Sequence, residues 1–359
     1  MPTPGTPMPT PHHLPHKATF AALQRPTRRK CGHLRQGRER RRDAYDGRMR
    51  LIFAGTPDVA VPALEAIVAS EHEVVAVITQ PDARGKRGKQ LHASPVKQAA
   101  ERHGLPVLDP ADARDPEFIA QVAALEADAA AVVAYGQILR PALLDATRHG
   151  WVNLHFSILP AWRGAAPVQR SLMAGDEITG ATTFLLDKGM DTGPVIGTMT
   201  ERIRPADTAG DLLDRLAVAG APFLLQSIEA LVSGTAEPQP QPADGVSHAA
   251  KLNRDDAYVA WDRPSHTVDR QVRGCTPAPG AWTTLPDGTV AKAGPVSPVS
   301  GGPTGTPGHV FERDGRVLVA TGSDPVVLST IAPAGKKPME AAAWWRGARL
   351  PETAILGEA

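Results

Sequence analysis

Starting at Met49, short apolar runs alternate with helical stretches, and this alternation restricts the fold more than any other feature of the chain. Residues 51–54, 74–79, 130–134 and 151–154 have the length and composition of buried strands. Residues 57–70, 94–103 and 115–126 lie between them and have helical patterns. The last two open on Ser94-Pro95 and Asp115-Pro116, each a capping side chain followed by proline. Because alternating strands and helices imply right-handed crossovers, we expect an α/β fold with a doubly wound, mostly parallel sheet.

The pattern continues beyond the fourth strand. Residues 182–187 and 195–200 predict two further strands, joined by a turn that contains Asp191. Residues 208–231 predict an amphipathic helix, which opens on a capping box formed by Thr208 and Asp211. We therefore expect the first domain to extend over residues 49–235.

The composition changes at residues 236–246, where prolines at positions 238, 240 and 242 predict a stiff linker. Beyond it, short apolar runs are separated by Gly, Pro and Asp; they cover residues 257–261, 281–284, 290–293, 308–311, 316–320 and 326–331. This spacing predicts a small β-barrel or sandwich over residues 247–359. Residues 339–346 predict a short helix, whose Trp344 and Trp345 should cover the barrel.

Residues 1–48 are rich in proline and then in arginine, with almost no apolar periodicity. They carry 11 basic and 3 acidic residues, a net charge of +8, whereas the remainder carries 28 and 35, a net charge of −7. Such a segment cannot bury enough surface to offset its chain entropy, so we expect it to be disordered. Three interpretations stay open: a mis-assigned start preceding Met49, a basic arm that contacts RNA, and a transit peptide that lacks the usual serines.

Composition excludes several other classes of protein. A hydrophobic fraction of 42% and a charged fraction of 21% are typical of a soluble globular chain, and no run of about 18 apolar residues predicts a membrane span. The two cysteines, Cys31 and Cys275, lie far apart, which suits a reducing compartment and predicts no metal site. Neither the glycine-rich dinucleotide fingerprint nor the phosphate-binding loop is present.

A polar pair interrupts the apolar run that ends near residue 156. Asn153 and His155 are two residues apart, so in a strand both side chains point to the same face, close to the strand's carboxyl end. Ligands of open α/β sheets bind beyond these ends, and paired hydrogen-bond donors there can hold an oxygen that becomes negative during acyl transfer. A single polar residue at a strand end is usually structural, but here Asp191 adds a carboxylate downstream.

With Ser157-x-Leu159-Pro160-x-Trp162-Arg163-Gly164 after this pair, the chain resembles the methionyl-tRNA formyltransferase family from about residue 49 to its end. Asn153, His155 and Asp191 match that family's catalytic triad in type and spacing. Phe156 departs from the pattern, because a small residue is common there, and it leaves the shape of the nearby pocket wall open.

The resemblance implies a formyltransferase-type, Rossmann-like catalytic domain that uses 10-formyltetrahydrofolate as co-substrate and methionyl initiator tRNA as acceptor. Asn153 and His155 would hold the formyl oxygen, and Asp191 would hold or charge the imidazole and help to move a proton. The residues implied to line the folate pocket, mainly through backbone groups, are Ser157, Ile158, Leu159 and Pro160. Arg163 and Gln169 would order that loop.

The same resemblance assigns the tRNA contacts. Residues 80–90 form a basic loop after a predicted strand, and Arg87 and Lys89 match a family motif that enters the end of the acceptor stem. The C-terminal domain would be an OB-type barrel, in which Lys336 and Lys337 contact the tRNA backbone or are simply exposed lysines. Since residues 49–359 are acidic overall, RNA contacts must come from such local patches.

Two alternatives remain at this point. Other formyl-folate transferases and hydrolases share the Asn-x-His…Asp site, although residues 162–167, the basic loop and the C-terminal domain argue against them. An RNA-binding protein with an inactive α/β domain is the second, and the intact triad argues against it. The resemblance further implies a cytoplasmic monomer without a membrane partner and without a catalytic metal.

Overall fold

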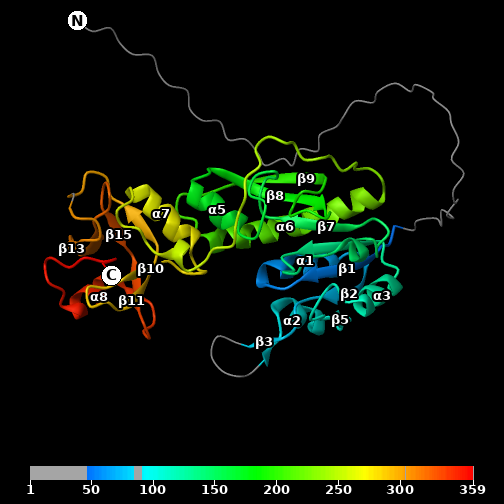
Figure 1. The fold of residues 1–359 in the computed structure, drawn as a ribbon, viewed down its shortest axis with the longest axis horizontal. Coiled ribbons are helices and arrows are strands. Elements are labelled where there is room, and N and C mark those ends of the chain that lie inside the picture. Colours follow the sequence, from blue (N-terminus) through cyan, green and yellow to red (C-terminus); the bar gives the residue numbers. More distant parts are fainter. Residues whose placement is uncertain (1–46, 85–90, 304, 359) are drawn as a thin grey trace, which may run out of the picture. The chain divides into compact units, whose positions relative to one another are not determined.

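The structure is a computed structural model that describes residues 47–84, 91–303 and 305–358. In the first part of this range, seven strands form one sheet in the order β5-β2-β1-β6-β7-β8-β9. Their bounds are β1 (Arg50–Gly55), β2 (Glu73–Ile78), β5 (Val107–Leu108), β6 (Ala129–Val133), β7 (Trp151–His155), β8 (Ile178–Leu185) and β9 (Val195–Arg202). The strands from β5 to β7 pair in parallel, whereas β8 and β9 are antiparallel. The predicted doubly wound, mostly parallel sheet is therefore confirmed (Figure 1).

Helices cover both faces of this sheet (Figure 1). A short 3-10 turn, η1 (Asp58–Ala60), leads into α1 (Val61–Val68), which packs on one face together with α2 (Pro95–Arg102) and α6 (Ala209–Val232). The other face packs against α3 (Pro116–Ala124) and α4 (Pro141–Leu144). Alternate residues of β1 divide accordingly, because Leu51 and Phe53 belong to the first core and Ile52 to the second.

The predicted helix starts are confirmed. The Ser94 hydroxyl accepts from the Lys97 amide at 3.0 Å, and the Thr208–Asp211 capping box is complete. Helix α6 is long and apolar enough to cross a membrane by length and composition alone. Its buried residues recur at helical spacing and pack on the sheet, which accounts for that composition.

Residues 251–358 contain a second hydrophobic core between antiparallel strands. Four strands form each of two sheets within the described residues, in the orders β10-β11-β16-β17 and β12-β15-β14-β13. Their bounds are β10 (Trp282–Thr284), β11 (Val290–Ala293), β12 (Val296–Pro298), β13 (Val310–Arg313), β14 (Arg316–Val319), β15 (Val326–Leu328), β16 (Thr330–Pro333) and β17 (Met339–Glu340). Helices α7 (Ser265–Gly274) and α8 (Ala341–Ala348) complete the domain; Trp344 is buried in its core and Trp345 packs against it, as predicted.

Two predictions for this region were wrong in detail. Residues 257–261 do not form a strand, because the Asn253 side chain accepts from the amides of Asp255 and Asp256 and bends the chain into η2 (Asp255–Ala257). Residues 326–331 form two strands in different sheets, and Ser329 between them bonds to Pro295 through its backbone and its hydroxyl. The sequence pattern also left α7 and α5 (Pro167–Ala174) unassigned.

The proline-rich segment is bonded to the first domain along much of its length. We call residues 236–249 the connecting segment. Gln239 exchanges two backbone hydrogen bonds with Val195 of β9, at 2.7 and 2.8 Å. Farther along, the Arg163 amide donates to the Ser247 carbonyl at 2.9 Å, and the Ala249 amide donates to the Arg163 carbonyl at 2.7 Å. The connecting segment therefore lies beside the loop that follows β7.

Candidate functional site

A pocket of about 590 Å³ lies beyond the carboxyl ends of β6 and β7. The chain reverses its winding direction between β1 and β6, and such switch points are where open α/β sheets bind their ligands. Three segments line most of the pocket: the loop after β6, the end of β7, and the turn between β8 and β9. Their lining residues are Ala134–Leu139, Asn153–Phe156 and Leu186–Asp191.

Strand β7 supplies Asn153 and His155 to this pocket, as the spacing predicted. Asn153 pairs with Val132 on the parallel side and with Phe184 on the antiparallel side, so its backbone is fixed within the sheet. Its side chain is half-buried and has no hydrogen-bond partner among residues 47–84, 91–303 and 305–358. The amide N–H groups are therefore free to bind an oxygen in the pocket.

His155 is buried, and both of its ring nitrogens face protein oxygens. Nε2 lies 2.9 Å from the Trp162 carbonyl, which can only accept, so Nε2 carries a proton. Nδ1 lies 3.7 Å from Asp191 Oδ2. A neutral imidazole thus has its lone pair at Nδ1, and a second proton there would be placed beside a carboxylate.

Asp191 reaches the site from the turn between β8 and β9. Its Oδ2 accepts a hydrogen bond from the Gly164 amide at 2.8 Å, which aims the carboxylate toward the loop after β7 and toward His155. Gly164 has a φ of +125°, and a Cβ there would lie 2.7 Å from the Ala249 carbonyl oxygen. Only glycine fits this close approach, so the position of the donor depends on that residue.

Three residues around the pocket other than glycine adopt left-handed backbone conformations: Ala134 with φ of +48°, Trp162 with +61° and Asp191 with +54°. Side chains rarely adopt this region because Cβ crowds the backbone, and residues held there often cluster at ligand sites. Each of the three belongs to the pocket wall or bonds to a residue of it.

The predicted folate residues occupy a neighbouring position. The segment Ser157–Pro160 follows β7 but does not belong to the lining of the pocket. The Thr182 hydroxyl donates to the Ser157 carbonyl at 2.7 Å, and the Leu159 amide donates to the Thr182 hydroxyl at 3.1 Å. These bonds tie the segment to β8 and so hold the end of β7. Phe156 itself is buried and forms part of the pocket wall.

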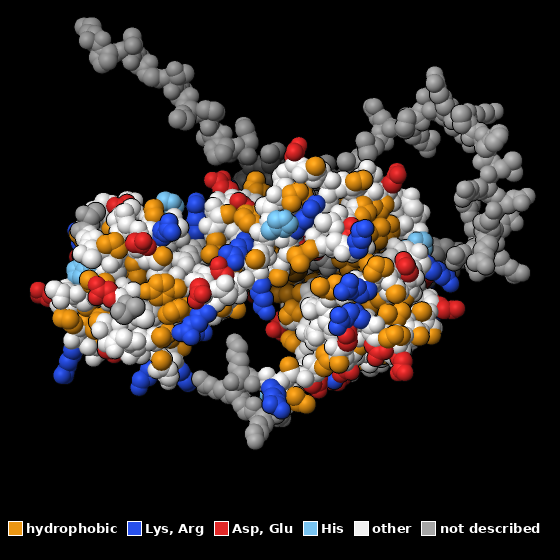
Figure 2. Space-filling view, in the orientation of Figure 1, with side chains coloured by type: hydrophobic (Ala, Val, Ile, Leu, Met, Phe, Trp, Pro, Cys, Tyr) orange, Lys and Arg blue, Asp and Glu red, His pale blue; other side chains and the backbone are white. Residues whose placement is uncertain are grey.

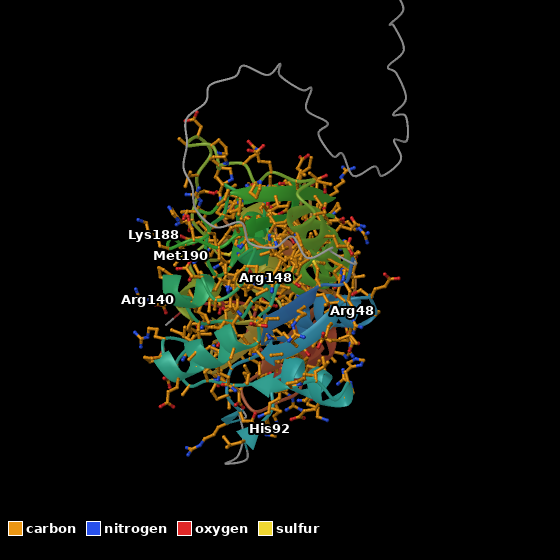
Figure 3. All side chains as sticks on the ribbon, turned by 90° about the vertical axis from the view of Figure 1, so that its right-hand side faces the viewer. Arg48, His92, Arg140, Arg148, Lys188 and Met190 are labelled. Atoms are coloured by element: carbon orange, nitrogen blue, oxygen red, sulfur yellow. The ribbon has the colours of Figure 1, made fainter. Side chains whose placement is uncertain are left out.

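Sequence reasoning missed the loop after β6, whose only signal was its place after a strand. Tyr135 lines the pocket and is 2% exposed, yet its hydroxyl has no partner among the described residues. Burial raises the pKa of this phenol to about 12, so the group stays a neutral donor. At the rim, Ile138 and Met190 are 73% and 65% exposed. Figure 3 shows Lys188, Met190 and Arg140 toward the same edge of the view.

Two of the predicted tRNA contacts, Lys336 and Lys337, lie outside this pocket. Lys336 and Lys337 are exposed in the turn between β16 and β17, and Lys336 lines a second cavity of about 670 Å³ beside Trp344. This cavity lacks the convergent Asn, His and Asp groups of the first. Arg87 and Lys89 lie outside the described residues. Figure 2 shows basic and acidic side chains interspersed over the face in view.

Comparison with known proteins agrees with the resemblance seen in the sequence. Residues 49–228 match the family described as formyl transferase, and residues 251–349 match the family described as formyl transferase, C-terminal domain. The methionyl-tRNA formyltransferase of Salinispora tropica is 55% identical over 308 residues, which cover 86% of this chain and 100% of that protein. That of Thermobifida fusca is 53% identical over 310 residues, again with 86% and 100% covered.

Solved structures share the fold at low sequence identity. HypX from Aquifex aeolicus, in complex with tetrahydrofolic acid, superposes with a TM-score of 0.59 at 17% identity, over 82% of this chain and 46% of that one. The sugar 3N-formyltransferase WlaRD, in the presence of dTDP and 5-N-formyl-THF, superposes with a TM-score of 0.58 at 16% identity, over 80% and 99%. This chain thus spans less than half of HypX and nearly all of WlaRD.

Proposed function

Because the chain belongs to the methionyl-tRNA formyltransferase family, we propose that its pocket carries out formyl transfer to the α-amino group of methionyl initiator tRNA. The protein is a formyl-transferring enzyme of translation initiation, and its reaction depends on folate. Our proposal extends to the identity of the donor, 10-formyltetrahydrofolate, and to the residues that act on it.

The donor's place is the pocket beyond β6 and β7. Its volume of about 590 Å³ and largely apolar walls suit a flat heterocycle. The unpartnered Asn153 amide supplies a polar group within those walls. When bound, the folate supplies the formyl group, while the protein orients it and excludes water. Residues 157–160, which were predicted to line the folate site, would then contribute indirectly: their bonds to β8 hold the end of β7, which carries Asn153 and His155.

One observation carries the assignment: Asn153 and His155 from β7 and Asp191 from the turn between β8 and β9 converge on one pocket. The chemical problem is attack by a neutral amine on a formyl carbon, which places negative charge on the formyl oxygen. The Asn153 amide would donate to that oxygen. His155 would supply a second donor from Nδ1, because Nε2 is already committed to the Trp162 carbonyl.

Asp191 would have two roles: to stabilise a positive charge on His155 and to move a proton. Its carboxylate, 3.7 Å from Nδ1, stabilises the protonated imidazole that donates to the oxyanion. The proton that the attacking nitrogen loses must reach the leaving nitrogen of the folate. Asp191 would relay it, directly or through a water molecule. Neither a metal nor a covalent enzyme intermediate enters this scheme.

The tRNA contacts remain part of the proposal. Arg87 and Lys89 would bind phosphates at the acceptor end, and Lys336 and Lys337 would bind the backbone elsewhere. Substituting Arg87 with alanine should therefore raise the KM for tRNA and leave the KM for folate unchanged. We also keep residues 236–246 as the domain boundary, with catalytic and tRNA-contacting domains on either side, in a monomer that acts in the cytoplasm.

A formyl-transfer assay tests the proposal. Wild-type enzyme and Asp191→Ala are incubated with 10-formyltetrahydrofolate and with Met-charged initiator tRNA, Met-charged elongator tRNA or no acceptor. We expect formylation of the initiator tRNA alone, and its loss in the variant. Deformylation of folate without a tRNA product would move the chain to the hydrolases. No turnover of folate at all would leave only a binding protein.

A further inference from the structure

The turn that carries Asp191, residues 187–193, is held by a side chain from the connecting segment. Gln241 Nε2 donates to the Asp191 carbonyl at 2.8 Å and to the Gly193 carbonyl at 2.9 Å. Both hydrogens of the Gln241 side-chain amide therefore bond to backbone carbonyls of the turn, at Asp191 itself and two residues after it. Gln241 is half-buried and does not line the pocket, so it acts on the turn and not on the substrate.

Arg163 fixes the orientation of this amide. Its Nε and Nη2 both donate to Gln241 Oε1, at 3.1 and 2.6 Å. A guanidinium has donors only, so the amide oxygen must face Arg163 and the NH2 group must face the turn. Arg163 is in turn held by backbone bonds to Ser247 and Ala249 on the connecting segment.

The turn needs such a support because the bonds that Asp187 makes within it do not reach the carbonyls of Asp191 and Gly193. Asp187 accepts from the Gly189 amide at 2.9 Å and from the Thr192 hydroxyl at 2.7 Å. Asp191 itself has a left-handed backbone, and Gly193 is buried with no room for a Cβ against the Leu185 carbonyl. Without Gln241, the carbonyls of Asp191 and Gly193 would lose the partner that defines this conformation.

The side chain and the backbone of Asp191 are thus both held, directly or through Gln241, by the adjacent residues Arg163 and Gly164. The Gly164 amide holds the carboxylate, and the adjacent Arg163 orients the glutamine that holds the backbone. We propose that Gln241 is a positioning residue of the formyl-transfer reaction, which sets the turn so that the Asp191 carboxylate faces His155. This inference rests on the proposed function of Asp191.

The test compares three variants of the full-length enzyme. Gln241→Met keeps the length of the side chain and removes its hydrogen bonds. Gln241→Glu keeps an oxygen for Arg163 but turns a second oxygen toward the two carbonyls of the turn. Gln239→Met is the matched control, because that exposed side chain bonds only to the Glu237 carbonyl of its own segment.

Rates are measured with 10-formyltetrahydrofolate and Met-charged initiator tRNA, well below the lowest melting temperature of the set. We expect kcat to fall by up to about 10²-fold in both Gln241 variants, since a shift of about 1 Å in a reacting group has that effect. The control should match wild type. Melting temperatures should differ too little to account for the loss. In an Asp191→Ala background, Gln241→Met should cause little further loss, because the two residues act as one unit.

Three outcomes would overturn the inference. The first is full activity in both Gln241 variants, and the second is rescue by Gln241→Glu, which would mean that only the Arg163 contact matters. The third is a loss that multiplies with that of Asp191→Ala, because Gln241 would then act on something other than the carboxylate. Failure of the proposed function is separate: it would appear as unchanged kcat in Asp191→Ala alone.

Discussion

Replacing Asp191 with asparagine removes one negative charge and one proton acceptor from the site and keeps the size and shape of the side chain. The amide oxygen of asparagine can still accept from the Gly164 amide, which now donates to Oδ2 at 2.8 Å. The left-handed backbone of residue 191 also tolerates asparagine better than most residues. The substitution therefore removes the charge and the proton-relay role of the carboxylate together, while it keeps the contact with the loop after β7.

The distance between His155 Nδ1 and Asp191 Oδ2 sets the size of the effect. At 3.7 Å and an effective dielectric constant of about 20, a pair of unit charges attracts by about 4.5 kcal/mol. Both side chains are largely buried, at 7% and 17% exposed, so screening by solvent is limited. If that attraction is present in the transition state and absent in the variant, kcat falls by roughly 10³-fold.

The assay is single-turnover formylation of Met-charged initiator tRNA at saturating 10-formyltetrahydrofolate, beside thermal melting. Asp187→Asn is the control, because it removes a carboxylate charge from the same turn, where Asp187 bonds to Gly189 and Thr192 and not to His155. We expect Asp191→Asn to lose at least tenfold more activity than this control, at an unchanged melting temperature.

Equal losses in Asp191→Asn and Asp187→Asn would refute the reasoning, because a general change of charge near the pocket would then explain both. A loss below tenfold in Asp191→Asn would also refute it. In that case the pairing of His155 with a carboxylate contributes little to the transition state, and the carboxylate could serve only to shape the loop.

Three other substitutions have defined outcomes. Asn153→Ala should lower kcat by about 10²–10³-fold with little change in melting temperature, as expected for the loss of one oxyanion donor. Gly164→Ala should lower the free energy of unfolding by roughly 1–3 kcal/mol in denaturant titrations, because its φ is +125° and its Cβ would meet a backbone oxygen of the connecting segment. Asp256 has its pKa lowered by a backbone N–H from Asn253 and, against the opposing effect of burial, by Arg170. Since the folded pKa lies below the unfolded one, this carboxylate stabilises the fold above the ordinary value of 3.8, and the effect disappears as the pH falls through the lowered pKa. Asp256→Asn should remove about 1 kcal/mol at neutral pH and that part of the acid dependence, measured by unfolding as a function of pH.

Local sequence patterns predicted a large part of the catalytic domain. Alternation with a period of two placed Asn153 and His155 on one face of β7, and the strand indeed presents both to the pocket. Ser94 and Thr208 marked helix starts, because a capping side chain bonds to amides only two or three residues away. Such features depend only on residues a few positions apart, so they can be predicted from the sequence.

The same local reasoning failed where a nearby side chain or a distant strand competed with the apolar pattern. Residues 257–261 are apolar enough for a strand. However, the Asn253 side chain accepts from the amides of Asp255 and Asp256, just before this run, and bends the backbone there. Residues 326–331 read as one run, yet Ser329 bonds to Pro295 and the chain passes from one sheet to the other. The apolar period along a chain does not indicate which strands it will pair with in an antiparallel sheet.

The residues of the site could be named from the sequence, but the tertiary structure alone decides how they work together. The sequence contains Asn153, His155 and Asp191 and a family pattern that includes them. The proton at His155 Nε2, the aim of the Asp191 carboxylate and the support from Gln241 follow from contacts with Trp162, Gly164 and a segment 50 residues farther along. Those contacts form only when the folded sheet brings distant loops together, because hydrogen bonds act over about 3 Å and no sequence period links their partners.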